Sequence, residues 1–203
     1  MTIEDRIKVF EKLGEFLMDF CNENPNSNHP LETIIKSSSS YNGWFTSSNI
    51  RFSISAICNN LSSAKLFSWL SSYSIPIEAK KNVSIIMAGN IPLVGFNDFL
   101  CVLMSGHRAI VKLSSKDNRL FLPIIEELIK IEPRFKDDIK LVEKVENFDA
   151  VIATGSNESF KQFEYYFKDY PTLLRKSRTS VAILTGKESL DERKALANDI
   201  FLY

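Results

Sequence analysis

Residues 83–92 read VSIIMAGNIP and carry the clearest strand signal in the chain. The apolar part, residues 83–88, is a short run typical of a buried strand, and Gly89 ends it. Apolar residues at helical spacing follow over 96–103, up to Gly106, and residues 109–113 form the next apolar run. We therefore expect a strand, a helix and a second strand in succession.

The same alternation continues towards the C-terminus. The remaining expected elements are a helix over 121–129 with Pro123 in its first turn, strands at 139–145 and 150–153, a helix at 160–167, a strand at 181–184 and a helix from 190. Strands that alternate with helices predict an α/β fold: a parallel, Rossmann-like sheet with helices on both faces.

The first part of the chain has a different, helical pattern. Apolar residues recur at helical spacing from Ile3 to Phe20, and Thr2 with Asp5 is expected to cap this helix. Further helices are expected after Thr46 and over 66–73, a loop at 24–30 and a turn at 37–40. We predict an N-terminal helical segment at 1–78 and a dinucleotide-binding, Rossmann-like domain at 79–203.

Composition excludes several classes of protein. The chain has 203 residues, of which 44% are hydrophobic, and its 25 basic residues equal its 25 acidic ones, so a nucleic-acid partner is not expected. No apolar run is long enough for a transmembrane segment, and the N-terminus lacks a signal core. The cysteines, Cys21, Cys58 and Cys101, are far apart, which favours a reducing, cytoplasmic location. With only His29 and His107 beside them, no metal site is predicted.

The candidate ligand-binding residues follow the predicted strands, because ligands of such sheets bind at the carboxyl ends of the strands. Asn90 can donate an amide hydrogen bond to an oxyanion, and Lys112 can reach ribose hydroxyls or a phosphate. Gly155 and Ser156 begin a predicted helix whose free N–H groups attract phosphate. Taken singly, each has a structural explanation: a turn for Asn90, a solvated lysine, and plain helix capping.

Taken together, these segments resemble the aldehyde dehydrogenase superfamily. Its members carry Pro-Trp-Asn-x-Pro, a helix, a Lys-Pro-Ser-Glu stretch and a Thr-Gly-Ser turn, and three stretches are more specifically similar to its acyl-CoA reductase branch, which includes the fatty acid reductase of bacterial luminescence. The similar stretches are MAGNIP (87–92), SGHRAIVKLSS (105–115) and TGS (154–156), and for the branch RKSRTSVAILTGKES (175–189), NGWFT (42–46) and WLSSY (69–73).

The resemblance implies reduction of a long-chain fatty acyl thioester to an aldehyde. In such enzymes a cysteine thiolate forms an acyl-enzyme, and hydride from the reduced nicotinamide gives a thiohemiacetal that collapses. By the same resemblance, Asn90 is the oxyanion-stabilising asparagine and Lys112 with Ser114 contacts the adenosine ribose. Gly155 and Ser156 then lie near the pyrophosphate and nicotinamide.

Three departures from the family pattern sharpen these expectations. Ser115, followed by Lys116, replaces the nucleotide-reading glutamate, which favours NADP(H) over NAD(H). No carboxylate stands near Leu174 or Arg175, where hydrolytic members keep their base, which favours thioester chemistry over aldehyde oxidation. The nucleophilic cysteine is expected in a loop after Tyr203, so we predict a partial protein that lacks the catalytic domain and is inactive alone.

Two other readings remain open. The chain is alternatively a non-catalytic nucleotide- or protein-binding α/β module. It is less well explained as an unrelated doubly wound enzyme such as a methyltransferase, because the second strand ends in lysine and serines rather than an acid. The acyl carrier (CoA or an acyl-protein), the acyl chain length and a homo-oligomeric state are left undetermined by the sequence.

Overall fold

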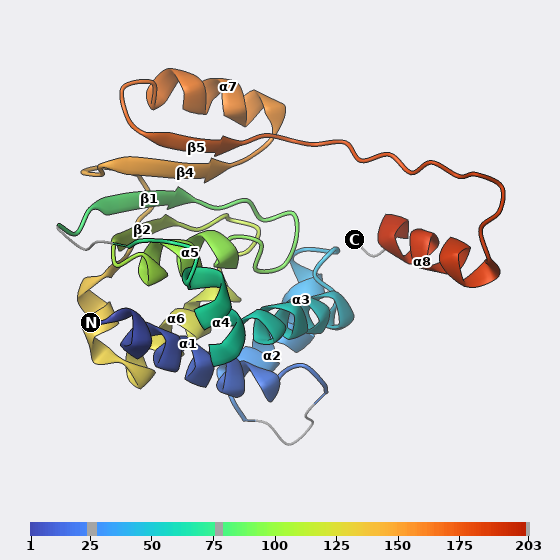
Figure 1. Ribbon diagram of the computed structural model, residues 1–203, viewed down its shortest axis with the longest axis horizontal. Coiled ribbons are helices and arrows are strands. Elements are labelled where there is room, and N and C mark those ends of the chain that lie inside the picture. The colour runs from blue at the N-terminus through green and yellow to red at the C-terminus, as the bar shows by residue number, and fades with distance from the viewer. Residues whose placement is uncertain (24–27, 76–78, 202–203) are drawn as a thin grey trace.

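The computed structural model describes residues 1–23, 28–75 and 79–201, and it contains a parallel sheet flanked by helices (Figure 1). The sheet has five strands in the order β3-β2-β1-β4-β5, and every neighbouring pair is parallel. The strands are β1 (Asn82–Ile86), β2 (Arg108–Lys112), β3 (Ile139–Leu141), β4 (Ala150–Thr154) and β5 (Thr172–Arg175). The expected α/β class with a parallel sheet is confirmed.

Helices precede the sheet and connect its strands. Four lie in the N-terminal segment: α1 (Ile3–Met18), α2 (Pro30–Ser37), α3 (Ser47–Asn60) and α4 (Ser63–Leu70). The others are α5 (Phe96–Met104), α6 (Phe121–Ile131), α7 (Asn157–Tyr166) and α8 (Leu190–Phe201), with short 3₁₀ helices η1 (Ser38–Ser40) and η2 (Pro133–Asp137). Among the described residues, no helix combines the length and apolar character that crossing a membrane requires.

Helix α1 shows why the N-terminal sequence folds as expected. The Asp5 N–H donates to Thr2 Oγ1 at 3.1 Å, and the Thr2 N–H donates to Asp5 Oδ2 at 3.2 Å, which completes a capping box. One face of the helix, including Phe10 and Leu13, is fully buried and packs mainly against α3 and α6. The helical segment therefore shares one core with the helices that cover the sheet.

The connections distribute the helices over both faces of the sheet. Helices α5 and α6 link β1 to β2 and β2 to β3, whereas α7 links β4 to β5 in the opposite direction along the sheet. Right-handed crossovers then place α7 on the face opposite α5 and α6. The core is formed on the α5 and α6 side, where Ile85, Val111, Phe99 and Ile124 are fully buried.

The chain near the C-terminus departs from the expectation. The strand expected at 181–184 is wrong, because this segment is extended, unpaired and exposed, with Val181 87% and Ile183 86% exposed. The edge strand is instead β5, which was not predicted and pairs with β4. After it, residues 176–189 lead away from the sheet to α8 (Figure 1).

Smaller differences concern element bounds. Helix α2 was not predicted; it begins at Pro30, with His29 as its N-cap, inside the loop expected at 24–30, of which 24–27 lie outside the described residues. The strand expected at 139–145 is shortened to β3, and the turn expected at 37–40 contains η1. The expected boundary at residue 78 also lies outside the described residues.

Candidate functional site

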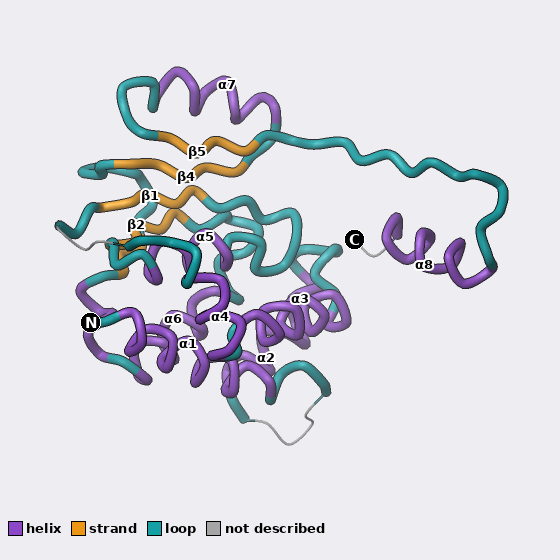
Figure 2. The backbone as a smooth tube through the Cα atoms, in the orientation of Figure 1, coloured by secondary structure: helices purple, strands orange, loops and turns teal. Residues whose placement is uncertain are grey.

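A single groove of about 1430 Å³ runs along the carboxyl ends of the strands. Because the strands are parallel, the loops that follow them leave on the same side of the sheet (Figure 2). The groove is lined by loop residues that follow all five strands, in the segments 86–91, 111–116, 141–143, 154–156 and 175–178. It is the position at which sheets of this type bind ligands.

All six residues predicted from the sequence line this groove. They come from three separate loops and are brought together by the parallel alignment of β1, β2 and β4. They are Asn90, Lys112, Ser114, Ser115, Gly155 and Ser156. The structure thus assembles them on one surface, while their individual roles remain proposals.

Asn90 is exposed in the loop after β1, immediately before the turn that leads into α5. Among the described residues, no group hydrogen bonds to its side-chain amide, so both amide N–H groups are open to a ligand. The loop lies close to the one after β2, because a Cβ atom on Gly89 would collide with the Ser114 side chain.

Lys112 is the last residue of β2 and is half-buried. Its ammonium group has no ion-pair partner among the described residues, so its charge is available to an anion in the groove. In the following turn, the Lys116 N–H donates to Ser114 Oγ at 3.3 Å, while Ser115 is exposed. The segment 112–116 therefore presents two hydroxyls and two cations to the groove.

The turn between β4 and α7 is tightly packed. A Cβ atom on Gly155 would lie 2.8 Å from Ser159 Cβ and 3.1 Å from the Phe163 ring, so only glycine fits without a shift. Ser156 is the N-cap of α7 and accepts a hydrogen bond from the Ser159 N–H at 3.3 Å. Packing and capping thus explain both residues structurally, and the positive end of the α7 dipole still faces the groove.

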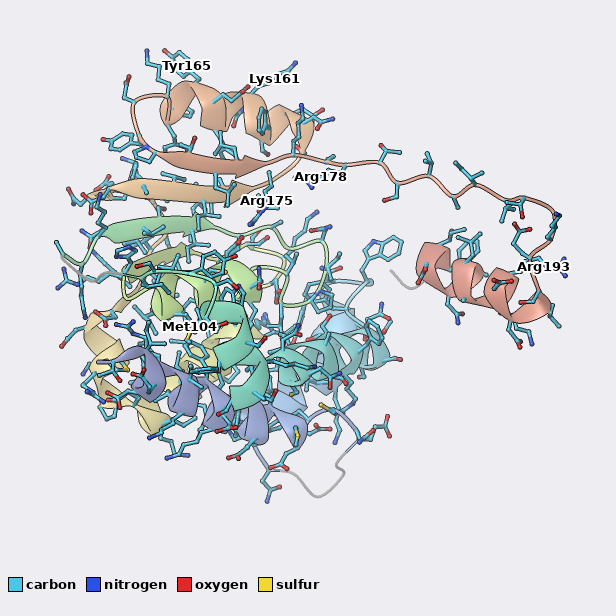
Figure 3. The ribbon with its side chains drawn as sticks, in the orientation of Figure 1. Met104, Lys161, Tyr165, Arg175, Arg178 and Arg193 are labelled. Atoms are coloured by element: carbon cyan, nitrogen blue, oxygen red, sulfur yellow. The ribbon has the colours of Figure 1, made fainter. Side chains whose placement is uncertain are left out.

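Four cations at the groove were not named as site residues in the sequence analysis: Lys116, Arg175, Lys176 and Arg178. Arg175 ends β5 (Figure 3). Its Nη1 lies 2.6 Å from both carboxylate oxygens of Asp98, a buried residue of α5. Recognition of β5 as a strand would have placed Arg175 at a strand end. With Lys112, five cations line the groove against one carboxylate, Glu143.

The cysteines lie away from this groove. Cys101 is half-buried in α5, and burial, followed by the nearby Asp98 carboxylate, raises the pKa of its thiol. Burial likewise raises the pKa of Cys58 to about 12, and its Sγ lies 3.8 Å from Cys21 Sγ. Neither Cys58 nor Cys101 is therefore activated as a thiolate in the described structure.

Comparison with known proteins agrees with this geometry. No curated protein sequence matches the chain. Among solved structures, an aldehyde dehydrogenase from Bacillus cereus in complex with NAD+ is similar, with a TM-score of 0.67 and 16% sequence identity. The match covers 100% of this chain but 44% of the dehydrogenase, so the chain spans less than half of that neighbour. At this identity the likeness concerns the fold.

The sequence model of one family matches the greater part of the chain. The family is acyl-CoA reductase (LuxC), and the match runs over residues 66–203. The matched region contains α5 to α8, all five strands and every residue that lines the groove. The chain therefore belongs to the acyl-CoA reductase (LuxC) family.

Proposed function

We propose that the chain supplies the NADPH-binding groove and the oxyanion-stabilising asparagine of an enzyme that reduces a fatty acyl thioester to an aldehyde. The observation that carries the proposal is the groove itself, in which three loops from β1, β2 and β4 bring Asn90, Lys112 and Gly155 to one surface. Membership of the acyl-CoA reductase family supports the reaction class.

The groove has the chemistry that a nicotinamide dinucleotide requires. A nicotinamide dinucleotide carries a negatively charged pyrophosphate. The groove offers cations and the N-terminal end of α7, a ten-residue helix, and both attract phosphate groups. Apolar side chains such as Val94 and Leu122 line it as well and can pack against a ring. The similar dehydrogenase is an NAD+ complex, which supports a cofactor of the same class here. When bound, this cofactor supplies the reducing equivalent.

The loop after β2 supports NADP(H) over NAD(H). Ser115 and Lys116 are both exposed at the groove, so a ribose 2′-phosphate would meet a hydroxyl and an ammonium group there. The one carboxylate in this loop, Asp117, is buried and accepts a hydrogen bond from the Leu93 N–H instead. A carboxylate facing the ribose would repel the phosphate, and this loop presents none.

Asn90 is suited to an acyl intermediate, and Arg175 supports the reduction of that intermediate over its hydrolysis. The free amide of Asn90 can hydrogen bond to the oxygen of a tetrahedral acyl intermediate and stabilise its negative charge. On the β5 side of the groove, Arg175 is held by Asp98, where hydrolytic relatives keep a carboxylate base. Without a base, water is poorly activated, and the acyl group is preserved for reduction.

None of Cys21, Cys58 and Cys101 lines the groove, so the proposal assigns the nucleophilic thiol to none of them. The acyl carrier is CoA, a carrier protein or an acyl-protein. The free state of Cys21, Cys58 and Cys101 supports a reducing, cytoplasmic setting.

Calorimetric titration with NADPH and NADH tests the cofactor assignment. We expect wild type to bind NADPH more tightly than NADH, and Lys112→Ala to weaken NADPH binding about tenfold through loss of a charge-assisted contact. Lys161→Ala is the matched control, because Lys161 is exposed on α7 and points away from the groove (Figure 3). No heat with either nucleotide would contradict the proposal and favour a protein-binding module.

A further inference from the structure

The turn that follows Asn90 has a backbone conformation that its sequence disfavours. The Val94 N–H donates to the Ile91 carbonyl at 3.3 Å, so Ile91, Pro92, Leu93 and Val94 form a β-turn. Pro92 occupies the first central position, and Leu93 occupies the second with φ of 58°. A positive φ at this position is normally adopted by glycine or asparagine, and it costs leucine about 1–2 kcal/mol.

Two interactions hold Leu93 in this conformation. Its side chain is buried, with 3% exposed, in the core under α5. Its N–H, which this kind of turn leaves free, donates to Asp117 Oδ2 at 2.7 Å. Removal of either interaction leaves the left-handed conformation held by the other alone.

Asp117 belongs to the loop that carries the proposed nucleotide contacts. Its own N–H donates to the Ser114 carbonyl at 3.0 Å, so the carboxyl group is fixed to the Lys112–Lys116 loop. The side chain is buried, with 6% of the residue exposed, and Oδ1 has no hydrogen-bond partner in the described parts of the chain. Burial raises the pKa of this carboxyl to about 7. Burial of a carboxyl group without a cation costs free energy, so its presence in the core indicates a specific role.

We propose that Asp117 is a positioning residue that fixes the turn after Asn90 to the nucleotide-binding loop. The inference rests on the proposed function for the roles of the two loops, and on the Asp117–Leu93 hydrogen bond for their connection. Asp117 is not among the residues that line the groove; it sets the direction in which the Asn90 amide leaves the end of β1. A disturbance of the loop after β2 is transmitted through this bond to the turn that follows Asn90.

Amide hydrogen exchange of the Leu93 N–H, followed by NMR on the full chain, tests the connection without any ligand. We expect Asp117→Ala to accelerate exchange at Leu93 by at least about tenfold and to shift the Asn90 side-chain amide signals. Asp117→Asn keeps an acceptor of the same size, so the exchange rate of the Leu93 N–H should stay within about threefold of wild type. The Asn90 side-chain amide signals should shift less than in Asp117→Ala. Asp137→Ala, an exposed aspartate on η2, is the control.

A second variant separates positioning from folding. Glycine adopts the left-handed conformation without steric cost, so in Leu93→Gly the turn no longer depends on Asp117. The shift of the Asn90 signals caused by Asp117→Ala should therefore be at least about threefold smaller in Leu93→Gly than in wild type. If the Leu93 N–H exchanges at the wild-type rate in folded Asp117→Ala, the positioning role is overturned. The same follows if Asp117→Ala shifts the Asn90 signals equally in wild type and in Leu93→Gly. If wild type binds no NADPH while these exchange results hold, the proposed function fails and the connection stands.

Discussion

The two halves of the sheet are built from the same kind of unit but are packed very differently. In the packed half, formed by β1, β2, β3, α5 and α6, helix α6 buries Phe121, Ile124 and Leu128 and packs against helix α1. In the open half, formed by β4, β5 and α7, no residue of α7 is buried. The burial of a helix in this fold thus depends more on which other elements cover that helix than on the strand–helix–strand unit to which it belongs.

The groove crosses the boundary between the halves. Asn90 and Lys112 come from the packed half, whereas Gly155 and Arg175 come from the open half. The β1–β4 ladder and the Arg175–Asp98 ion pair join the two sides. A cofactor bound in the groove would therefore contact a rigid side and a weakly supported side at once.

The largest expected effect contrasts two phenylalanines. Phe99 in the packed half is fully buried and packs edge-to-face on Phe121, so Phe99→Ala should lower the free energy of unfolding by about 3–5 kcal/mol. Phe167 in the open half is half-buried against Phe148, so Phe167→Ala should cost about 1–2 kcal/mol. Urea unfolding of both variants measures the difference, and equal losses would refute the contrast.

The next effect is the pH dependence of stability, which we assign to Asp117 in the packed half. Its pKa is raised from 3.8 to about 7, so between these values the native state holds a proton that the unfolded chain has released. Stability should therefore fall by a few kcal/mol as pH rises from 4 to above 7. In Asp117→Asn this fall should disappear from urea unfolding series; a curve parallel to wild type would assign it elsewhere.

The smallest effect concerns the ion pair that joins the halves. Asp98 is buried and Arg175 is about one-third exposed, so Arg175→Met should cost about 1–3 kcal/mol, mainly by leaving the carboxylate without its cation. The double variant Asp98→Asn, Arg175→Met should recover part of this loss. Thermal unfolding of Arg175→Met, Asp98→Asn and the double variant measures this coupling. If the losses of the two single variants simply add in the double variant, the pair is not coupled.

Sequence patterns predicted β1 and β2 in the packed half and β4 and α7 in the open half, but they missed the edge strand β5. Helix α1 is predictable because spacing and a capping box agree, and β1 and β2 because continuous apolar runs mark buried strands. Strand β5 has four residues, half-buried or exposed, at a sheet edge, which leaves too little pattern to detect. The apolar run at 181–184 looked like a strand but has no pairing partner in the described structure.

The candidate site was predictable where it depends on strand ends and unpredictable where it depends on tertiary contacts. Asn90, Lys112 and Gly155 follow strands that the pattern reveals, so their assembly in one groove follows from a parallel sheet. The Asp98–Arg175 and Leu93–Asp117 contacts join residues 77 and 24 positions apart, and no local pattern carries them. These contacts position the site, and only the folded structure reveals them.

The central claim is that strand ends from both halves form one dinucleotide groove. Hydrogen exchange with and without saturating NADPH, read by mass spectrometry, tests it most directly. We predict slower exchange at residues 89–91 and 113–116 in the packed half and at 155–157 in the open half, all with the same dependence on NADPH concentration. Protection confined to one half, or absent from all three segments, would contradict the claim.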